Sequence, residues 1–338
     1  MCTLRLLVLL PTRFLGNFVI SLQAIAALVR AQDVDLLIDD RHTSLVRVAL
    51  GSGFNTIAYP RSELKALGPV GQLRAFTGLV THLRRERYDA VVDLDGTSLS
   101  SNLVALVRAR RRTGPDFARH PRFYDERVAM DQATQHCFDD YAKVVEAVTG
   151  QQVERQYLKL PDVPAPTMPA SIQSIPNEQR LICLHPSASK SYKEWPASRF
   201  AALSEELHAR NFHVVLLGAG ASERQTISHI REHSNHPLTD THNQLDISQL
   251  TWLIQKSHLY IGNDSGPMHL AASTGTPVIA LFGPTELIRW QPLSDTTTVL
   301  SHQQLCHRNC QPEACLGSYR CMSAITLEEV LTIVDTHG

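Results

Sequence analysis

The chain has 338 residues, more than a single hydrophobic core usually supports, so two domains of comparable size are the first expectation. Hydrophobic residues make up 43% and charged residues 19%, values of a globular protein that exclude a disordered or fibrous chain. With 32 basic and 33 acidic residues, the net charge of -1 gives no overall field to recruit nucleic acid or an acidic membrane.

The first half of the chain alternates short apolar runs with helical stretches. The runs that predict strands span residues 4–10, 34–40, 55–59 and 89–96. Strands that are apolar along almost their whole length are typical of a parallel sheet covered by helices on both faces. We therefore expect a doubly wound α/β domain over residues 1–155.

A proline-rich stretch without periodicity follows and predicts a linker over residues 156–178. The alternation then resumes, with strands predicted at residues 180–186, 212–220, 258–264 and 276–283. A second α/β domain is predicted over residues 179–338, closed by a helix at 326–336 that begins at Thr326 as N-cap. Two such domains would bind ligands in a cleft between the carboxyl ends of their sheets.

The turn after the strand at 258–264 is the most informative segment. Asp264, Ser265 and Gly266 lie between a strand and a helix whose free amides and dipole would bind a diphosphate, with His269 one turn further on. The alternative is that Asp264 and Ser265 only cap the helix and that His269 is a core residue. From the residues alone the two interpretations are equal.

A second polar segment follows the strand at 180–186. Lys193 is a candidate phosphate contact, because a leaving diphosphate needs positive charge when no metal supplies it. Ser187 and Ser189 could add hydroxyl donors. The alternative is a solvated lysine beside a packed Trp195.

A third strand end carries Gly218, Gly220 and Glu223. Small residues there would admit a nucleoside, and Glu223 could accept a hydrogen bond from a hydroxyl. By itself this glycine pattern is weak.

Taken together, these segments resemble a known family. The order and separation of HPSASKSYKEWPASRF and GNDSGPMHLAASTGTPVIALFGPT are similar to those of the ADP-heptose:lipopolysaccharide heptosyltransferases, glycosyltransferase family 9. Further similarity lies in RFLGNFVISLQAIAALVR, YDAVVDLDGTSLSS and CLGSYRCMSAITLEEV, so that nearly the whole chain is covered. The resemblance implies the GT-B fold, in which two Rossmann-like domains face each other across a cleft.

The resemblance also implies an enzyme that needs no cofactor for catalysis. It would be an inverting glycosyltransferase that moves a heptose or related sugar from an ADP-sugar to the lipopolysaccharide core or another bacterial glycan acceptor. The N-terminal domain would bind the acceptor and the C-terminal domain the nucleotide-sugar. The implied donor-binding residues are Ser187, Lys193, Gly218, Glu223, Asp264, Ser265, Gly266, His269 and Thr285.

Inversion requires a base that takes the proton of the acceptor hydroxyl, and the family has an aspartate after the glycine of its first turn. This chain has Asn17 there, which can orient a hydroxyl but cannot act as a base at neutral pH. The replacement candidates are Asp93 or Asp95 at one strand end, and Asp39 or Asp40 at another. Each could equally cap a turn. The catalytic candidates are therefore Asn17, Asp93 and Lys193.

Two alternatives to a working transferase stay open. One is a catalytically silent relative that binds nucleotide-sugar as a partner subunit, and it differs from an enzyme in lacking turnover. The other is a sugar-nucleotide epimerase of similar fold, which would isomerise the donor without an acceptor.

Four cysteines gather in a loop-like stretch at residues 306–321, namely Cys306, Cys310, Cys315 and Cys321. Four soft ligands so close together predict a structural zinc or iron site. The separations are not those of a common zinc finger. Free thiols or disulfides are the alternatives.

The remaining cysteines, Cys2, Cys137 and Cys183, are scattered, which suits a reducing compartment and predicts a cytoplasmic protein. The first apolar run ends before the ~20 residues needed to span a bilayer. Arginines at 84–87 and 108–112 would attract a lipid-anchored acceptor at the inner membrane. The alternative for these arginines is a pair of solvated helix faces.

Overall fold

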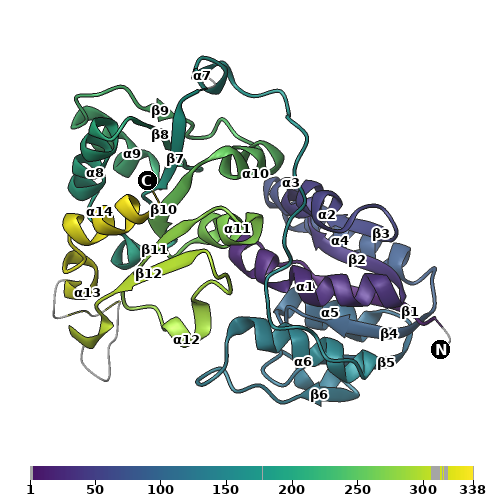
Figure 1. Ribbon diagram of the computed structural model, residues 1–338. Coiled ribbons are helices and arrows are strands. Elements are labelled where there is room, and N and C mark those ends of the chain that lie inside the picture. The colour runs from purple at the N-terminus through teal and green to yellow at the C-terminus, as the bar shows by residue number, and fades with distance from the viewer. Residues whose placement is uncertain (1–2, 177, 306–312, 314, 316–318, 338) are drawn as a thin grey trace. The chain divides into compact units, whose positions relative to one another are not determined.

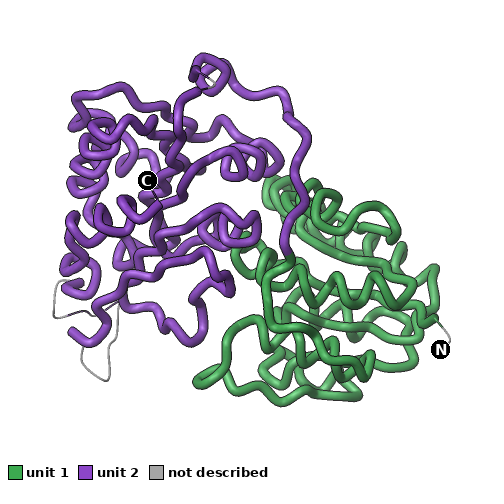
Figure 2. The backbone as a smooth tube through the Cα atoms, viewed as in Figure 1, with its two compact units in different colours: residues 1–158 green, residues 159–338 purple. Residues whose placement is uncertain are grey.

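The computed structural model describes residues 3–176, 178–305, 313, 315 and 319–337. The chain divides into two compact units, residues 1–158 and 159–338 (Figure 2). Within the described residues, each unit contains one six-stranded sheet in which every pairing is parallel.

The sheet of unit 1 has the strand order β3-β2-β1-β4-β5-β6. Its strands are β1 (Arg5–Leu10), β2 (Asp33–Asp39), β3 (Asn55–Tyr59), β4 (Tyr88–Asp93), β5 (Ala109–Pro115) and β6 (Glu126–Val128). Its helices are α1 (Leu15–Ala31), α2 (Thr43–Leu50), α3 (Arg61–Ala66), α4 (Pro69–Leu83), α5 (Ser98–Leu106) and α6 (Cys137–Thr149), with short 3₁₀ turns η1 (Asp40–His42) and η2 (Pro121–Phe123).

Both faces of this sheet are covered, as the apolar runs predict. Leu7 and Leu9 of β1 pack in a cluster that includes Leu83 of α4 and Leu103 of α5. Helices α1 and α6 run side by side (Figure 1). The alternate positions of β1 are just as completely buried.

The sheet of unit 2 has the order β12-β11-β10-β7-β8-β9. Its strands are β7 (Arg180–His185), β8 (Phe212–Leu216), β9 (Thr239–Asp240), β10 (Leu259–Asn263), β11 (Val278–Phe282) and β12 (Thr297–Ser301). Its helices are α7 (Ala170–Gln173), α8 (Ala197–Ala209), α9 (Arg224–Glu232), α10 (Ile247–Lys256), α11 (Gly266–Thr274), α12 (Leu287–Trp290), α13 (Arg320–Ser323) and α14 (Leu327–Thr336), with 3₁₀ turns η3 (Ser191–Lys193) and η4 (Gln303–Leu305).

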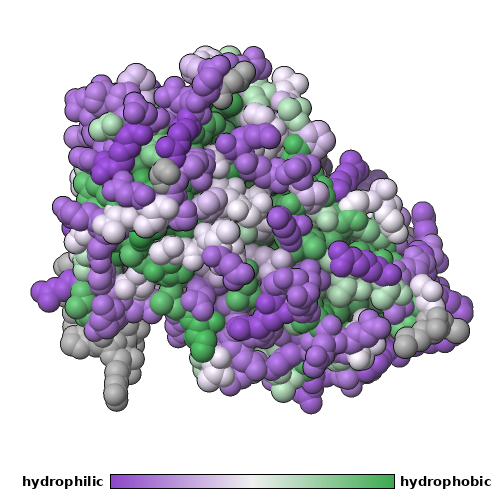
Figure 3. Space-filling model, viewed as in Figure 1, coloured by the Kyte–Doolittle hydropathy of each residue, from purple (hydrophilic) through white to green (hydrophobic). Residues whose placement is uncertain are grey.

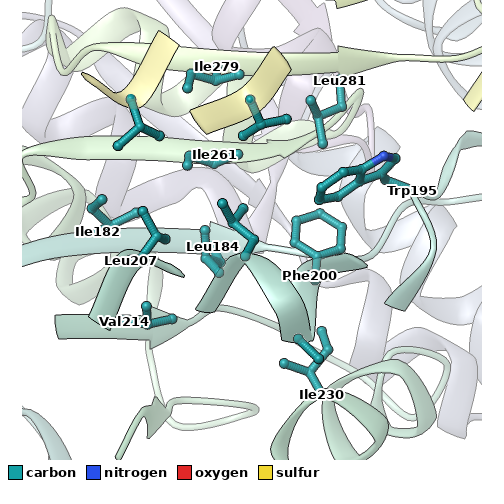
Figure 4. Packing of buried hydrophobic residues seen from close by; sticks show 14 of the residues in the cluster. Ile182, Leu184, Trp195, Phe200, Leu207, Val214, Ile230, Ile261, Ile279 and Leu281 are labelled. Atoms are coloured by element: carbon teal, nitrogen blue, oxygen red, sulfur yellow. The ribbon is translucent and has the colours of Figure 1, made fainter. Parts of the chain in front are cut away.

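One face of the unit 2 sheet packs against α8 and α9 (Figure 4). Phe200 and Leu207 of α8 are completely buried, and their separation of seven residues puts them on one face of the helix. Burial of a side chain of this size contributes roughly 1.5–3 kcal/mol. The Trp195 ring meets Phe200 edge-on at 5.0 Å, so the segment before α8 is anchored in the core.

The closing helix α14 begins with a reciprocal cap. The Thr326 hydroxyl accepts from the Glu329 amide at 3.1 Å, and the Glu329 carboxylate accepts from the Thr326 amide at 2.7 Å. Val330 and Val334 bury the inner face of the helix. The predicted N-cap is therefore confirmed.

The proline-rich stretch 156–178 is bonded to unit 2. The Leu160 amide donates to the Ser273 carbonyl at 2.9 Å, and Gln255 bonds both the Val163 amide and the Pro161 carbonyl. The stretch also contains α7. Its backbone thus follows α10 and α11.

Arginines 110–112 lie on strand β5 and not on a helix face, which corrects that alternative for them. Within the described residues, no helix has both the length and the apolar character needed to cross a membrane. Hydrophilic side chains predominate on the face in Figure 3, with hydrophobic patches between them.

Candidate functional site

Four neighbouring strands of unit 2, in the order β11-β10-β7-β8, end at one edge of the sheet because all are parallel. The segments after these strands carry the predicted donor-binding residues: Ser187 and Lys193 after β7, Gly218 and Glu223 after β8, Asp264, Ser265, Gly266 and His269 after β10, and Thr285 after β11. The topology brings together residues that are far apart in the sequence.

An ion pair joins two of these loops. Nζ of Lys193 lies 2.7 Å from Oδ2 of Asp264. The Asp264 side chain is 6% exposed and that of Lys193 21%, so the carboxylate is shielded while the ammonium still reaches solvent. An ammonium has three N–H donors, and this contact uses one of them. The others can bind an anion.

Asn263, which the sequence interpretation missed, fixes the loop that carries Lys193. Its Oδ1 accepts from the Trp195 amide at 3.0 Å, and its Nδ2 donates to the Pro186 carbonyl at 2.7 Å. Asn263 is completely buried. The two bonds clamp both ends of the loop to the end of β10, next to Asp264. The only signal in the sequence was its position at the end of a buried strand.

Ser265 does not use its hydroxyl to cap α11. Although it occupies the N-cap position, its Oγ lies 3.1 Å from Nδ1 of His185 at the end of β7. Nε2 of His185 in turn lies 3.5 Å from Oε2 of Glu223. The sequence did not predict a role for His185, because Ser265 and Glu223 lie far from it along the sequence. Ser265, His185 and Glu223 thus form a chain of polar contacts, the polar chain, across three strand ends.

Glu223 is held by its own loop as well. Its Oε2 also accepts from the Ala219 amide at 2.9 Å. Burial alone would raise the pKa of Glu223, but the contacts with His185 and the Ala219 amide lower it below its ordinary value overall. Glu223 is therefore an anion at neutral pH.

The amino end of α11 points unpaired amides toward this edge. The first N–H groups of an α-helix have no partner within the helix, and Pro267 at the second position has none to offer. This leaves the amides of Gly266 and Met268 as donors. His269, one turn in, is 3% exposed.

Three other residues that were predicted to bind the nucleotide-sugar are less accessible to a ligand. The hydroxyls of Ser187 and Thr285 are buried and have no hydrogen-bond partner among the described residues. At Gly218, an added Cβ would lie 2.3 Å from the Ile227 side chain and 3.1 Å from Glu223. The position that a side chain at residue 218 would occupy is thus already taken by other side chains, so only glycine fits there.

In unit 1, Asn17 lies half-buried in the first turn of α1, and Asp93 ends β4. Asp93 is completely buried and accepts from the Tyr124 hydroxyl at 2.5 Å and from the amides of Asp95 and Gly96. Gly96 has a φ of +65°, a conformation that favours glycine. Asp93 therefore holds the turn after β4.

Asp95 is the more accessible carboxylate at this strand end. It is half-buried, and its Oδ2 accepts from the Thr97 hydroxyl at 2.6 Å. Burial raises the pKa of Asp95 to about 6, with a further rise from the charge of Asp93 and opposition from Thr97 and Arg61. Asp95 can therefore exchange a proton near neutral pH.

Asp39 is the opposite case. Its carboxylate is completely buried, with Nε of Arg41 and Nε of Arg61 each 2.7 Å from its oxygens. Burial would raise the pKa of Asp39, but these bonds lower it to about 2. Arg61 also donates to the Pro11 carbonyl at 2.5 Å. The neighbouring Asp40 has a raised pKa because of burial and its closeness to Asp39.

Most of the sequence matches one known protein family. The sequence pattern of glycosyltransferase family 9 (heptosyltransferase) matches residues 76–319, more than half of the chain. The chain belongs to glycosyltransferase family 9. The matched region includes both Lys193 and the Asp264 turn.

Individual members of family 9 are similar over different lengths. Lipopolysaccharide heptosyltransferase 3 of Escherichia coli is 27% identical over 226 residues, an alignment that covers 65% of this chain and 66% of that protein, just under two thirds of its length.

Two solved structures resemble the whole family 9 chain. The glycosyl transferase family 9 structure from Veillonella parvula DSM 2008 has a TM-score of 0.82 at 19% identity, and covers 100% of this chain and 98% of that one. The E. coli ADP-heptose lps heptosyltransferase II has a TM-score of 0.75 at 20% identity, with 98% of each chain covered. The predicted α/β fold of the GT-B type is confirmed.

In this family 9 chain the predicted cysteine site is only partly described. Cys306 and Cys310 lie outside the described residues. Cys315 accepts a hydrogen bond from the Tyr319 amide at 3.4 Å, and Cys321 is buried in α13. Among the described residues, no three His, Cys, Asp or Glu side chains group as metal ligands.

Proposed function

We propose that this chain transfers a heptose or related sugar from an ADP-sugar to the lipopolysaccharide core or another bacterial glycan acceptor, with inversion at the sugar. The observation that carries the proposal is the Lys193–Asp264 pair beside the amino end of α11 in a family 9 chain. The name of the similar E. coli ADP-heptose lps heptosyltransferase II supports the choice of donor.

The diphosphate of the donor binds at the edge of the unit 2 sheet. Lys193 contributes the N–H donors that Asp264 does not use, and the amide of Gly266 adds a helix-end donor. Asp264 lies next to the transferred sugar, and Glu223 accepts from a hydroxyl of the nucleoside. His269 lines the same turn. Unit 2 is then the donor domain and unit 1 the acceptor domain.

The chemistry needs no metal in this scheme. Negative charge grows on the leaving diphosphate in the transition state, and a partly buried ammonium stabilises that charge more strongly than one in water. The charge on Lys193 and the dipole of α11 supply this stabilisation.

Asp95 is the proposed base in place of the aspartate that Asn17 replaces. Both carboxylates at the end of β4 were candidates, but the oxygens of Asp93 are engaged by Tyr124 and two turn amides. Asp95 is half-buried with a pKa raised to about 6, which suits proton abstraction near neutral pH. Asn17 then orients the acceptor hydroxyl.

A basic surface on unit 1 supports a peripheral contact with the inner membrane from the cytoplasmic side. Arg84, Arg85 and Arg87 precede β4, and the Arg108 carbonyl accepts from the Tyr88 amide at 3.1 Å, so the arginines before β4 and β5 are neighbours. Arg110 is 86% exposed. Such charge attracts anionic lipid and a phosphorylated acceptor.

A structural zinc or iron at the four cysteines stays a prediction, which elemental analysis of the purified protein checks. Less than one equivalent of metal in fresh protein would contradict it.

The donor site is tested by calorimetric titration with ADP, GDP and UDP. We expect selective ADP binding that Lys193→Ala weakens by about 100-fold, because a charged hydrogen bond and the ion pair are both lost. Lys190→Ala is the matched control, since Lys190 is an exposed lysine paired with Glu313. Indifference to all three nucleotides would remove the transferase proposal. Release of ADP only when acceptor is present separates an enzyme from a silent binding relative.

A further inference from the structure

His185 lies in the middle of the polar chain that crosses the edge of the unit 2 sheet. One ring nitrogen is 3.1 Å from the hydroxyl of Ser265, and the other is 3.5 Å from the carboxylate of Glu223. The His185 side chain is 5% exposed and that of Glu223 18%, so water screens this chain poorly. The imidazole connects a helix-end serine to an almost buried anion.

The protons on the ring decide what Ser265 can offer a ligand. A neutral imidazole whose Nε2–H points at Glu223 has a bare Nδ1, which accepts the hydroxyl hydrogen of Ser265. The serine then presents only lone pairs, which repel a phosphate oxygen. An imidazolium donates from both nitrogens, so Ser265 accepts from Nδ1 and its own hydrogen is free for an anion.

We propose that binding of the nucleoside diphosphate draws a proton from solvent onto His185 and so converts Ser265 from a hydrogen-bond acceptor into a donor to the diphosphate. The charged ring also adds a positive charge one hydroxyl away from the leaving group. His185 acts through Ser265 and is a positioning residue. The inference rests on the proposed donor site in unit 2.

Four titratable groups lie around His185 and Glu223. Glu223 is anionic, because its pKa lies below the ordinary value, and Glu194, which follows Lys193 in the segment after β7, interacts electrostatically with the ring. Tyr260 stays neutral because burial raises its pKa well above the ordinary value. His242 also interacts electrostatically with Glu223, so two histidines face the same carboxylate. Histidine is the side chain whose ordinary charge change falls near neutral pH.

The backbone packs closely against Glu223 and against the backbone of His185. An added Cβ at Gly218 would come within 3.1 Å of the Glu223 carboxylate. At Gly262, one would lie 2.9 Å from the His185 carbonyl. The Ala219 amide also fixes Glu223, so the carboxylate that faces Nε2 of His185 is held in place.

Calorimetry in two buffers of different ionisation enthalpy tests the proposal, because the difference in heat counts the protons taken up on binding. At about pH 8 the terminal phosphate of free ADP has already lost its proton. We expect wild-type protein to take up about one proton per ADP. His185→Gln and Ser265→Ala should take up almost none and bind ADP about 10-fold more weakly. His208→Gln, on α8, should behave as wild type.

Each outcome has a distinct meaning. If wild-type protein does not bind ADP, the proposed donor site fails before the proton switch is reached. If ADP binds without proton uptake, or if His185→Gln takes up as many protons as wild type, the switch is wrong and the donor site stands. Should His185→Gln fail to fold in a thermal melt, Ser265→Ala decides, since full uptake by that variant overturns the relay.

Discussion

The carboxyl edges of the two sheets each hold a buried aspartate next to a cation, but they use the cation differently. In unit 2, the Asp264 carboxylate pairs with one cation among the described residues, and the ammonium of Lys193 keeps two further N–H donors. In unit 1, Asp39 takes both Arg41 and Arg61, and these guanidiniums also donate to the Arg13 and Pro11 carbonyls. A cation with spare donors can bind a ligand, whereas cations bonded to backbone hold a loop.

The same contrast separates the two carboxylates at the end of β4. Asp93 is engaged on all sides and shapes the turn, while Asp95 accepts one hydroxyl and has its pKa raised to about 6. A group whose hydrogen-bonding capacity is already filled within the protein has a structural role. A group that keeps unused donors or acceptors is a candidate for ligand binding or catalysis.

The largest expected effect comes from removing the proposed base. Asp95→Asn should lower kcat by about 100- to 10,000-fold, the range for loss of a general base. In wild-type protein the rate should rise with pH through about 6, because the base must be unprotonated, and level off above it. The variant should show no such rise.

Steady-state assays across pH, with donor and acceptor at saturation, measure both effects. Asp116→Asn is the control, an exposed aspartate in the loop after β5 of the same sheet. A kcat of Asp95→Asn equal to that of wild type, with the same pH profile, would rule Asp95 out as the base.

An intermediate effect is expected on stability. The pKa of Asp39 is lowered from 3.8 to about 2, so its contribution is complete above its unfolded value and disappears as pH falls through about 2. Asp39→Asn should therefore reduce the free energy of unfolding by about 2 kcal/mol at neutral pH. The difference between variant and wild type should shrink as pH falls below about 4.

Urea titrations at several pH values provide this measurement. Asp33→Asn is matched to it, since Asp33 is 53% exposed and pairs with Arg5, and it should cost less than about 1 kcal/mol. A difference that stays constant from neutral to acid pH would mean that the arginine pairs of Asp39 do not stabilise the fold.

The apolar runs predicted eight of the strands, β1 to β4 and β7, β8, β10 and β11, because each contains a run of hydrophobic residues. They did not predict β5, β6, β9 or β12. β5 carries three arginines after Ala109, β6 has three residues and β9 two, and every residue of β12 is half-buried, so these strands lack the apolar signal.

The candidate site was predictable where one segment carries its own signal, as the Asp264 turn does. His185 and Asn263 escaped notice because their partners lie on other strands. Residue 262 of β10 pairs with His185 of β7, so the neighbours form only when the sheet assembles. Sequence spacing cannot reveal a contact that depends on strand order.

The smallest predicted effect tests, within unit 2, the difference between a residue that binds the ligand and a residue that only fixes a loop. Asn263 touches no ligand in the proposed site but clamps both ends of the Lys193 loop. Asn263→Ala should weaken ADP binding by about 10-fold, because Lys193 must then be ordered at the expense of binding energy. Calorimetry with a thermal melt measures it, and Asn235→Ala, at an exposed asparagine that bonds Glu205, is the matched control. Unchanged ADP affinity in a folded Asn263→Ala would mean that the ion pair with Asp264 alone orders the lysine.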